Sequence, residues 1–598
     1  MHVLRRILNY IGLGLRRLYF SQAEYLAGNY RRFLRGDTLL LIAAALIGVV
    51  SGLVIIAFNW CVEYAGDKFD SLFALASSMQ WWQYALFPFV PALGGLAVGL
   101  MQHYVFRTQP GHGVPEVILA ARFGRGRIHR RVILQKMLGA AFSIGSGGGG
   151  GREGPIVHVG AAVASAFTDL FRLSKTRGRM LIACGASAGI SGIFNAPIGG
   201  VLFALEAILG DFRIRTFTPI IVSSVAATAI TRSYYGNISL LHAPLNPSIE
   251  LYEFFMFIIL GVLIGFLAVF FLKATIAVEH FCEKYLPPSP VLRPAAGGFL
   301  AGILVMFFPI LMEQTYAPIN SALYSELPFW LLLIAALLKP IHMSLTLGSG
   351  GTGGAFAPAL KSGAMFGSAF GLLCYQLFPG LISAPSTYAL AGMGGLLAAT
   401  LHAPLTGIFI LIEITNDYRI ILPAMLTAVI ATIISQRFSK SSIYSYYLHR
   451  SGMELGSYVY LPSAGTLTIR EIIQPVHETI PMDMPISQVL TLFENSNAEA
   501  HVVVTKEGKY AGIVEFEDVR NILTATDMHE TFVAADIMIT PVRTVTPETS
   551  LEAVLKIFDE YGWRALPVFE PGDKENIRYI VTNIDAQKYY RQVVTPQA

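Results

Sequence analysis

Charged residues are scarce in this sequence. Asp, Glu, Lys and Arg make up 14% of its 598 residues, whereas soluble domains average about 25%. Residues 38–62 and 254–272 contain no charged residue at all, and a helix needs roughly 20 apolar residues to cross a bilayer. This scarcity excludes an ordinary soluble protein and predicts an integral membrane protein that is embedded in a lipid bilayer.

Cysteines and metal-ligand motifs are also few. No HExxH or comparable cluster is present, so we expect no metal site. The four cysteines are far apart in mostly apolar sequence, which favours buried free thiols over disulfides. They are Cys61, Cys184, Cys282 and Cys374.

A strong excess of one charge sign is absent as well. The net charge of +4 is too small and too scattered to indicate a nucleic-acid partner. Arginines instead cluster before the first apolar run and between residues 122 and 131, which predicts a cytoplasmic side for both regions. Residues 1–37 contain no apolar segment with a cleavage site, so we expect no signal peptide. We expect a multi-pass protein of the plasma membrane with both termini cytoplasmic.

A glycine-rich turn inside apolar sequence is the most informative feature that is present. Residues 146–155 read SGGGGGREGP, and irregular backbone survives in a membrane only where protein buries it or where it lines a cavity. Glu153 is then an ionisable group at membrane depth, which marks a functional site. Pro155 suits the first turn of a helix, and such a helix would point its positive end at an anion. The turn predicts an ion path.

The apolar part contains an internal duplication. Residues 195–206 (NAPIGGVLFALE) match residues 402–413 (HAPLTGIFILIE), and the turn at 147–151 has a counterpart at 348–354. Transporters built from inverted repeats bind their substrate at the repeat interface, where broken helices converge. We therefore expect the two glycine-rich turns to meet near the bilayer midplane.

Three glycine-rich motifs and one tyrosine occur in a fixed order along this part: GHGVPE at 111–116, GREGP at 151–155, GGAFAP at 353–358, and Tyr444. This set resembles the CLC family of chloride channels and chloride/proton antiporters, and the resemblance covers residues 38–450. It implies an α-helical polytopic fold of inverted repeats with broken helices, and a homodimer with one pore in each subunit.

The resemblance also implies roles for individual residues. Glu153 matches the gating glutamate, whose side chain competes with chloride for the central site. Amides and hydroxyls hold an anion without a full positive charge that would trap it. The anion-binding positions are Gly111, His112, Gly113, Ala355, Phe356 and Tyr444. Chloride is the expected substrate, and no cofactor is required.

Two departures from the family pattern affect mechanism. His112 stands where much of the family has serine, which affects selectivity among anions. Ala207 stands where many proton-coupled members have a glutamate, and an alanine cannot relay a proton. This favours a passive chloride channel, and a chloride/proton antiporter is the alternative. Glu206 is then a candidate proton path, although its repeat counterpart, Glu413, suggests that both glutamates satisfy helix ends.

The sequence changes character near Tyr460, where charges and alternating apolar positions begin. We predict a linker at 451–463 and a second domain at 464–598. Residues 480–493 match residues 545–558, and each copy continues into short apolar strands, which indicates compact α/β units.

This domain resembles a tandem pair of CBS domains, with copies at about 464–530 and 531–598. Such pairs often bind adenosine nucleotides. Thr582 and Asp585 fit the ribose-binding pattern of the second copy, whereas the first copy has Glu515 before Asp518. A purely structural module that stabilises a dimer is the alternative.

The sequence allows three other interpretations. A phosphate-binding loop at residues 145–150 lacks the preceding strand. A membrane enzyme that uses Glu153 as a general base lacks a nucleophile, so we expect no enzyme. A membrane-anchored CBS nucleotide sensor is the third.

Overall fold

The protein, described here from a computed structural model, consists of two compact units, Met1–Leu455 and Gly456–Ala598, which we treat separately. The structure describes residues 36–77, 86–107, 113–122, 127–171, 173, 175–210, 212, 214–236, 241, 249–312, 317–379, 382, 384–450, 467–476, 478–496, 498–516, 519, 533–540, 545–561, 563–570 and 577–594.

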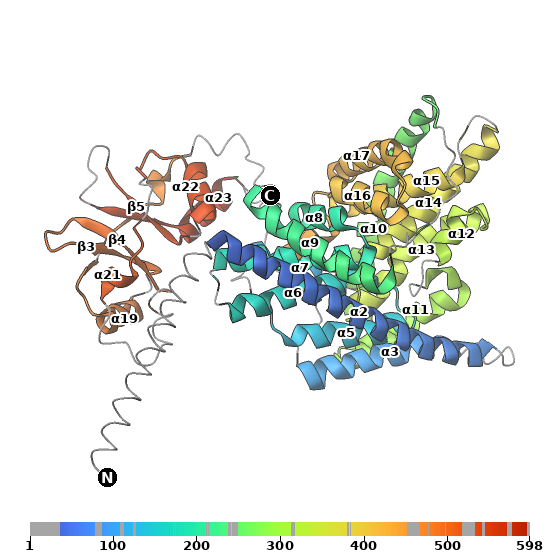
Figure 1. Ribbon diagram of the computed structural model, residues 1–598, viewed down its shortest axis with the longest axis horizontal. Coiled ribbons are helices and arrows are strands. Elements are labelled where there is room, and N and C mark those ends of the chain that lie inside the picture. The colour runs from blue at the N-terminus through green and yellow to red at the C-terminus, as the bar shows by residue number, and fades with distance from the viewer. Residues whose placement is uncertain are drawn as a thin grey trace, which may run out of the picture. The chain divides into compact units, whose positions relative to one another are not determined.

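The first unit consists of helices joined by turns in its described residues (Figure 1). Its first half contains α2 (Gly36–Ser77), α3 (Phe89–Leu100), η2 (Met101–Phe106), α4 (Val114–Arg122), α5 (Arg131–Gly145), α6 (Glu153–Leu170), α7 (Lys175–Phe194), α8 (Pro197–Phe203), η3 (Ala204–Leu209) and α9 (Ile214–Tyr235). Its second half contains α10 (Glu253–Tyr285), α11 (Leu292–Phe307), η4 (Pro309–Leu311), α12 (Ala317–Leu323), α13 (Phe329–Gly348), α14 (Phe356–Leu377), α15 (Pro385–Leu401), α16 (Pro404–Thr415), η5 (Tyr418–Ile420), α17 (Ile421–Phe438) and α18 (Ile443–Arg450).

Long and short apolar helices are mixed in this unit. Among the described residues, five helical stretches are long and apolar enough to cross a membrane: Thr38–Phe69, Phe89–Phe106, Glu253–Tyr285, Phe329–Gly348 and Tyr418–Arg450. Shorter apolar stretches lie at Pro197–Leu209, Leu292–Phe307 and Pro404–Thr415. The prediction of a polytopic protein with broken helices is confirmed.

The internal duplication is visible as two matching helix pairs, α6 with α7 and α14 with α15 (Figure 1). A Cβ atom on Gly160 would lie 2.1 Å from the carbonyl oxygen of Gly185, and one on Gly363 would lie 2.4 Å from that of Gly392. These glycines occupy corresponding repeat positions. Each pair therefore crosses at a point where only hydrogen fits between the backbones.

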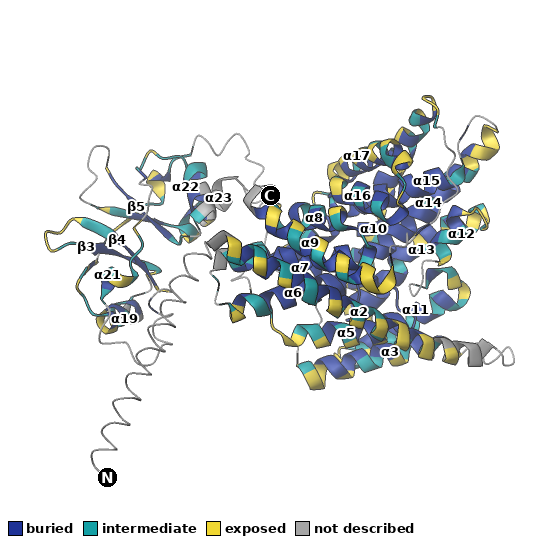
Figure 2. Ribbon diagram, in the orientation of Figure 1, coloured by how far each residue is buried: buried dark blue, intermediate teal, exposed yellow. Residues whose placement is uncertain are grey.

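The ends of these pairs also correspond. Asn195 follows α7 with φ 56°, and His402 follows α15 with φ 55°, so both helices stop at a left-handed residue. Pro197 and Pro404 then begin α8 and α16, where the missing N–H of proline costs no helical hydrogen bond. The interior of the unit is buried, as Figure 2 shows in dark blue.

Within its described residues, the second unit contains two three-stranded sheets. One has the order β2 (Thr479–Pro481), β3 (Ala500–Val504), β4 (Tyr510–Glu515), and the other has the order β1 (Gln474–Pro475), β6 (Tyr579–Thr582), β5 (Ala565–Val568). The helices are η7 (Ile469–Glu471), α19 (Ile486–Asn495), α21 (Ala534–Ile537), α22 (Leu551–Tyr561) and α23 (Asn583–Val594). α19 and α22 correspond in the two copies, as do β3 and β5, so the predicted tandem α/β repeat is confirmed.

Candidate functional site

The two glycine-rich turns lie against each other. The amide of Gly151 donates to the carbonyl of Gly354 over 2.7 Å, and the amide of Gly354 donates to the carbonyl of Gly151 over 2.9 Å. This reciprocal pair is an antiparallel bridge between the repeats. The expectation that the two turns meet is confirmed.

Hydroxyl groups hold each turn from the opposite repeat. Thr346 Oγ1 accepts a hydrogen bond of 2.9 Å from the amide of Gly149, and Ser143 Oγ accepts one of 3.3 Å from the amide of Thr352. Ser143 and Thr346 are buried and occupy corresponding positions in α5 and α13. Without these acceptors the turn amides would be unsatisfied inside the protein.

Positive backbone angles shape the two turns in the same way. Gly147 has φ 99° and Gly350 has φ 105°, a conformation that glycine adopts without the steric cost of a side chain. The matching angles show that the two turns have the same local backbone conformation, as expected for corresponding segments of the two repeats.

Glu153 is the first residue of α6, and its side chain turns toward the other repeat. The residue is 1% exposed, and its Oε2 accepts a hydrogen bond of 3.3 Å from the amide of Ala357 in the first turn of α14. A Cβ atom on Gly151 would lie 2.3 Å from the same oxygen. The carboxylate therefore occupies space kept free by a glycine, at the positive end of a helix that favours negative charge.

The third glycine motif joins this contact. Gly113 has φ 85°, and a Cβ atom there would lie 3.0 Å from the carbonyl oxygen of Gly154. A Cβ atom on Gly154 would in turn lie 2.7 Å from Cα of Gly354. All three motifs thus converge, although the predicted positions Gly111 and His112 lie outside the described residues.

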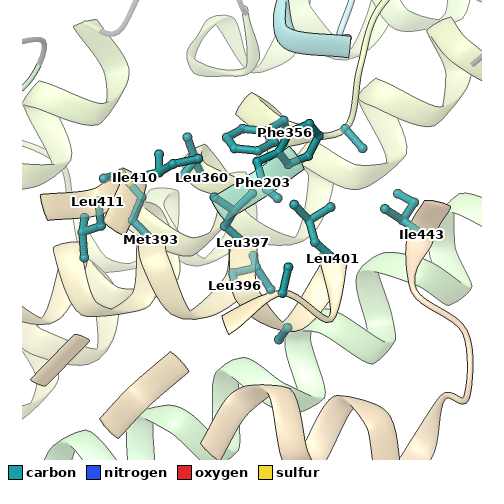
Figure 3. Packing of buried hydrophobic residues seen from close by; sticks show 14 of the residues in the cluster. Phe203, Phe356, Leu360, Met393, Leu396, Leu397, Leu401, Ile410, Leu411 and Ile443 are labelled. Atoms are coloured by element: carbon teal, nitrogen blue, oxygen red, sulfur yellow. The ribbon is translucent and has the colours of Figure 1, made fainter. Parts of the chain in front are cut away.

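Phe356, Ala355 and Tyr444 lie around the same place. Phe356 is fully buried, and the centroid of its ring lies 5.2 Å from that of Phe194 and 6.0 Å from that of Phe203. Figure 3 shows Phe356 and Phe203 in one apolar cluster that also contains Ile443, the first residue of α18. Tyr444 follows it in the sequence, is 5% exposed and belongs to the same buried cluster as Phe356.

Glu206 and Glu413 act as reciprocal helix caps. The carboxylate of Glu206 accepts hydrogen bonds from the amide of Leu405 at 3.2 Å and from the amide of Thr406 at 2.8 Å, both in α16. Glu413 accepts from the amides of Ile198 and Gly199 in α8, at 3.0 and 2.7 Å. Each repeat therefore supplies the carboxylate that satisfies the first turn of a helix in the other.

In the second unit the two copies differ at their equivalent positions. Thr582 Oγ1 donates to Asp585 Oδ2 over 2.6 Å, and Gln474 Nε2 donates to the same oxygen over 2.8 Å. In the first copy, Glu515 instead accepts a hydrogen bond of 2.7 Å from the amide of Arg564. Asp518 lies outside the described residues.

Sequence reasoning missed the two supporting hydroxyls and the amide of Ala357. The repeat alignment that paired the glycine-rich turns also pairs Ser143 with Thr346, so this signal was available. Nothing in the sequence indicated that the Glu153 side chain would reach the amide of Ala357 instead of those of Ala355 and Phe356.

Comparison with known proteins identifies the family and the fold. The model of the voltage-gated chloride channel family matches residues 94–436, which is more than half of the chain. The chain belongs to the voltage-gated chloride channel, or CLC, family. CBS domain models match residues 467–525 and 533–591, so the C-terminal unit is a tandem CBS pair.

Individual CLC relatives match over most of their length. A protein of Vibrio campbellii named H(+)/Cl(-) exchange transporter ClcA is 33% identical over 427 residues, which are 69% of this chain and 89% of that protein. A Ralstonia nicotianae protein named as chloride channel protein ClcB-like is 32% identical over 424 residues, 69% of this chain and 97% of that protein.

Comparison with solved structures also finds proteins of the CLC family. A slow cyanobacterial Cl-/H+ antiporter has a TM-score of 0.61 and 26% identity, covering 69% of this chain and 97% of that one. A eukaryotic CLC transporter has a TM-score of 0.70 at 20% identity, covering 91% of this chain and 97% of that one, and shows a shared fold. The chain is therefore an integral membrane protein of a chloride transport family whose members are transporters, not enzymes.

Proposed function

We propose that this CLC protein carries chloride through each subunit along a path that Glu153 opens and closes. The observation that carries the proposal is the Glu153 carboxylate, 1% exposed and bonded to the amide of Ala357 at the start of α14. A negatively charged oxygen there occupies a place suited to an anion. Chloride and the carboxylate would compete for it, and protonation of Glu153 would weaken the hold of the side chain.

The remaining anion contacts come from partial charges. We assign the amides of Ala355 and Phe356 and the hydroxyl of Tyr444 to the central site, and His112, between Gly111 and Gly113, to the inner approach. The convergence of Gly113 with Gly154 and Gly354 supports this arrangement. Donors that carry no full charge bind an anion weakly enough to release it.

Passive conduction is the mode that the residues favour. Ala207 provides no titratable group in η3, and both carboxylate oxygens of its neighbour Glu206 accept hydrogen bonds from the first turn of α16. A carboxylate held in this way acts as a helix cap. A proton supply to Glu153 from the inner side would need another route, such as water.

Chloride/proton exchange is the second candidate. It is favoured by the similarity to a protein named H(+)/Cl(-) exchange transporter and to a structure named as a Cl-/H+ antiporter. The two modes differ in whether a chloride gradient can move protons uphill.

Purified protein reconstituted in lipid vesicles decides between the two candidates. A chloride gradient is imposed, and chloride efflux and internal pH are recorded together. Conduction predicts chloride efflux with no uphill proton movement. Proton movement in fixed ratio to chloride would reject conduction in favour of exchange, and absence of chloride flux would reject the proposed function altogether.

We further propose a homodimer that buries an apolar face formed by α8, α9, α16 and α17. Large apolar side chains on these helices are exposed in the single chain although the helices are otherwise well packed. They are Ile198, Ile221, Val225, Leu405, Leu422, Met425, Val429 and Ile433. Family members are typically dimers. Both termini would lie on the cytoplasmic side of the plasma membrane.

The CBS pair is proposed to bind an adenosine nucleotide at its second copy only. Thr582 and Asp585 keep the hydroxyl and carboxylate of the ribose-binding pattern side by side, whereas Glu515 in the first copy is bonded to the amide of Arg564. Equilibrium dialysis of the whole protein with labelled ATP and AMP tests this. Thr582→Ala should abolish binding and Glu515→Gln should not.

The alternative of a membrane-anchored nucleotide sensor without transport has its own test. Chloride flux that persists after residues 464–598 are deleted would exclude it, because the membrane unit would then transport by itself.

A further inference from the structure

A buried carboxylate outside the proposed anion path contacts two segments that contribute residues to that path. Glu279 lies near the end of α10 and is 2% exposed. It accepts a hydrogen bond from the hydroxyl of Tyr447 and one of 3.2 Å from Nη1 of Arg450. Both donors belong to α18, the short helix that also carries Tyr444.

The same glutamate contacts the second glycine-rich turn. A Cβ atom on Gly348 would lie 2.9 Å from Cγ of Glu279 and 3.1 Å from its Cα. Gly348 is the last residue of α13 and the first of the run 348–354, after which Ala355 and Phe356 follow. Glu279 is therefore in direct contact with the segment that presents these amides.

The position of Tyr444 depends on how α18 is held. This helix has eight residues, and Tyr447 is one turn from Tyr444, so its hydroxyl contact fixes the rotation and depth of the whole helix. Tyr447 is 6% exposed, and a buried hydroxyl that loses its acceptor is costly. The bond between Tyr447 and Glu279 is thus a specific constraint on α18.

We propose that Glu279 is a positioning residue for anion transport, which sets the distance between the Tyr444 hydroxyl and the amides of Ala355 and Phe356. This inference rests on the proposed function, because it takes these groups to be the anion site. Glu279 itself does not contact the anion. It acts through α18 on one side and through Gly348 on the other.

Four variants and a matched control separate positioning from simple stability. Glu279→Ala removes both bonds, Tyr447→Phe removes only the hydroxyl, and Glu279→Gln retains an oxygen that can accept from Tyr447. Tyr444→Phe tests the proposed anion contact directly. Glu283→Ala is the control, because Glu283 also pairs with Arg450 on the same helix but is 42% exposed.

The readout is the chloride dissociation constant of the purified full-length protein, measured by isothermal titration calorimetry beside thermal unfolding. Loss of a hydrogen bond to a charged group corresponds to roughly a tenfold change or more in an equilibrium constant. We expect Glu279→Ala and Tyr447→Phe to weaken chloride binding about tenfold. Glu279→Gln should restore most of the affinity, and Glu283→Ala should leave it unchanged.

Two results would overturn the inference and identify its cause. If Tyr444→Phe weakens chloride binding but Tyr447→Phe and Glu279→Ala only lower the unfolding temperature, Glu279 is merely structural and the anion site stands. If Tyr444→Phe leaves chloride binding unchanged, the assignment of Tyr444 fails, and the positioning role fails with it. Should Glu279→Ala not fold, Tyr447→Phe alone decides.

Discussion

At the scale of single residues, the Glu153 side chain carries the proposed gate. Glu153→Gln keeps the size of the side chain and removes its charge, so it imitates the protonated state. We expect chloride flux to persist and to lose most of its dependence on pH, because the side chain can no longer lose or gain a proton. Flux from reconstituted vesicles at a series of pH values measures this. A pH profile equal to that of the unmodified protein would contradict the gating role.

A second residue-scale prediction concerns His501 in the CBS pair. Burial lowers the pKa of His501 below its ordinary value, and the charge of Glu478 opposes this shift only in part. Its Nε2 lies 3.0 Å from the hydroxyl of Ser496. His501 therefore binds a proton more readily in the unfolded chain than in the folded unit. Its contribution to folding stability is complete above about pH 6.5 and decreases as the pH falls below that value.

The measurement follows unfolding of the C-terminal unit through Trp563 in a protein whose other tryptophans are replaced by Phe. The unfolding temperature should fall between pH 7 and pH 5. His501→Gln should reduce that fall, because glutamine does not titrate in this range. An equal pH dependence in the variant would show that other groups are responsible.

At the scale of elements, the reciprocal caps between α8 and α16 are the clearest test of the duplication. Glu206→Ala and Glu413→Ala each leave first-turn amides without their acceptor, and loss of a cap costs about 0.5–2 kcal/mol. We expect both variants to lose stability, Glu206→Ala more than Glu413→Ala because it also loses the hydrogen bond from the Thr406 hydroxyl, with little change in chloride flux per folded protein. Thermal unfolding and vesicle flux measure the two effects.

The two glutamates serve as controls for each other. Each accepts hydrogen bonds from two first-turn amides of the other repeat, and Glu206 also accepts one from the hydroxyl of Thr406. Only Glu206 adjoins Ala207, at the position linked to proton coupling in the family resemblance. If Glu206→Ala changed proton movement while Glu413→Ala did not, Glu206 would be a proton path and not only a cap.

Much of the element organisation could be predicted because local sequence determines it. The repeats at 195–206 and 402–413 share proline and glycine at the same positions, and these residues specify where helices start and cross. The meeting of the two glycine-rich turns followed from the duplication. The strands of the CBS pair followed from short apolar runs.

Other features depend on contacts between distant segments and have no local signature. The bond of Glu153 to Ala357 joins residues 204 positions apart, and the contact of Glu279 with α18 joins residues 168 positions apart. η2 and η3 are π-helices, whose turns are wider than those of an α-helix, and each has only six residues. A segment this short has no distinct periodicity by which the sequence could indicate it. The anion-site roles of His112 and Tyr444 stay predictions.

At the scale of the whole molecule, the proposed homodimer makes a prediction about α17. Ile433 is 58% exposed in the single chain, and we place it in the dimer interface. Ile433→Asn would bury an amide without a partner, at a cost of about 1–3 kcal/mol for each copy. We expect the variant dimer to dissociate at protein concentrations at least tenfold higher than those at which the unmodified dimer dissociates.

Leu53→Asn is the matched control, because Leu53 is 56% exposed but lies on α2, outside the proposed interface. Mass photometry of the detergent-solubilised protein counts monomers and dimers at each concentration. Equal dissociation of the two variants would place the interface elsewhere.

The mutual bonding of the two turns makes each half of the membrane unit dependent on the other. A half inserted alone would expose the Gly151 amide and carbonyl and the Ser143 hydroxyl to hydrocarbon, where unmet polar groups are expensive. We therefore expect neither half to persist in a membrane when it is produced without the other.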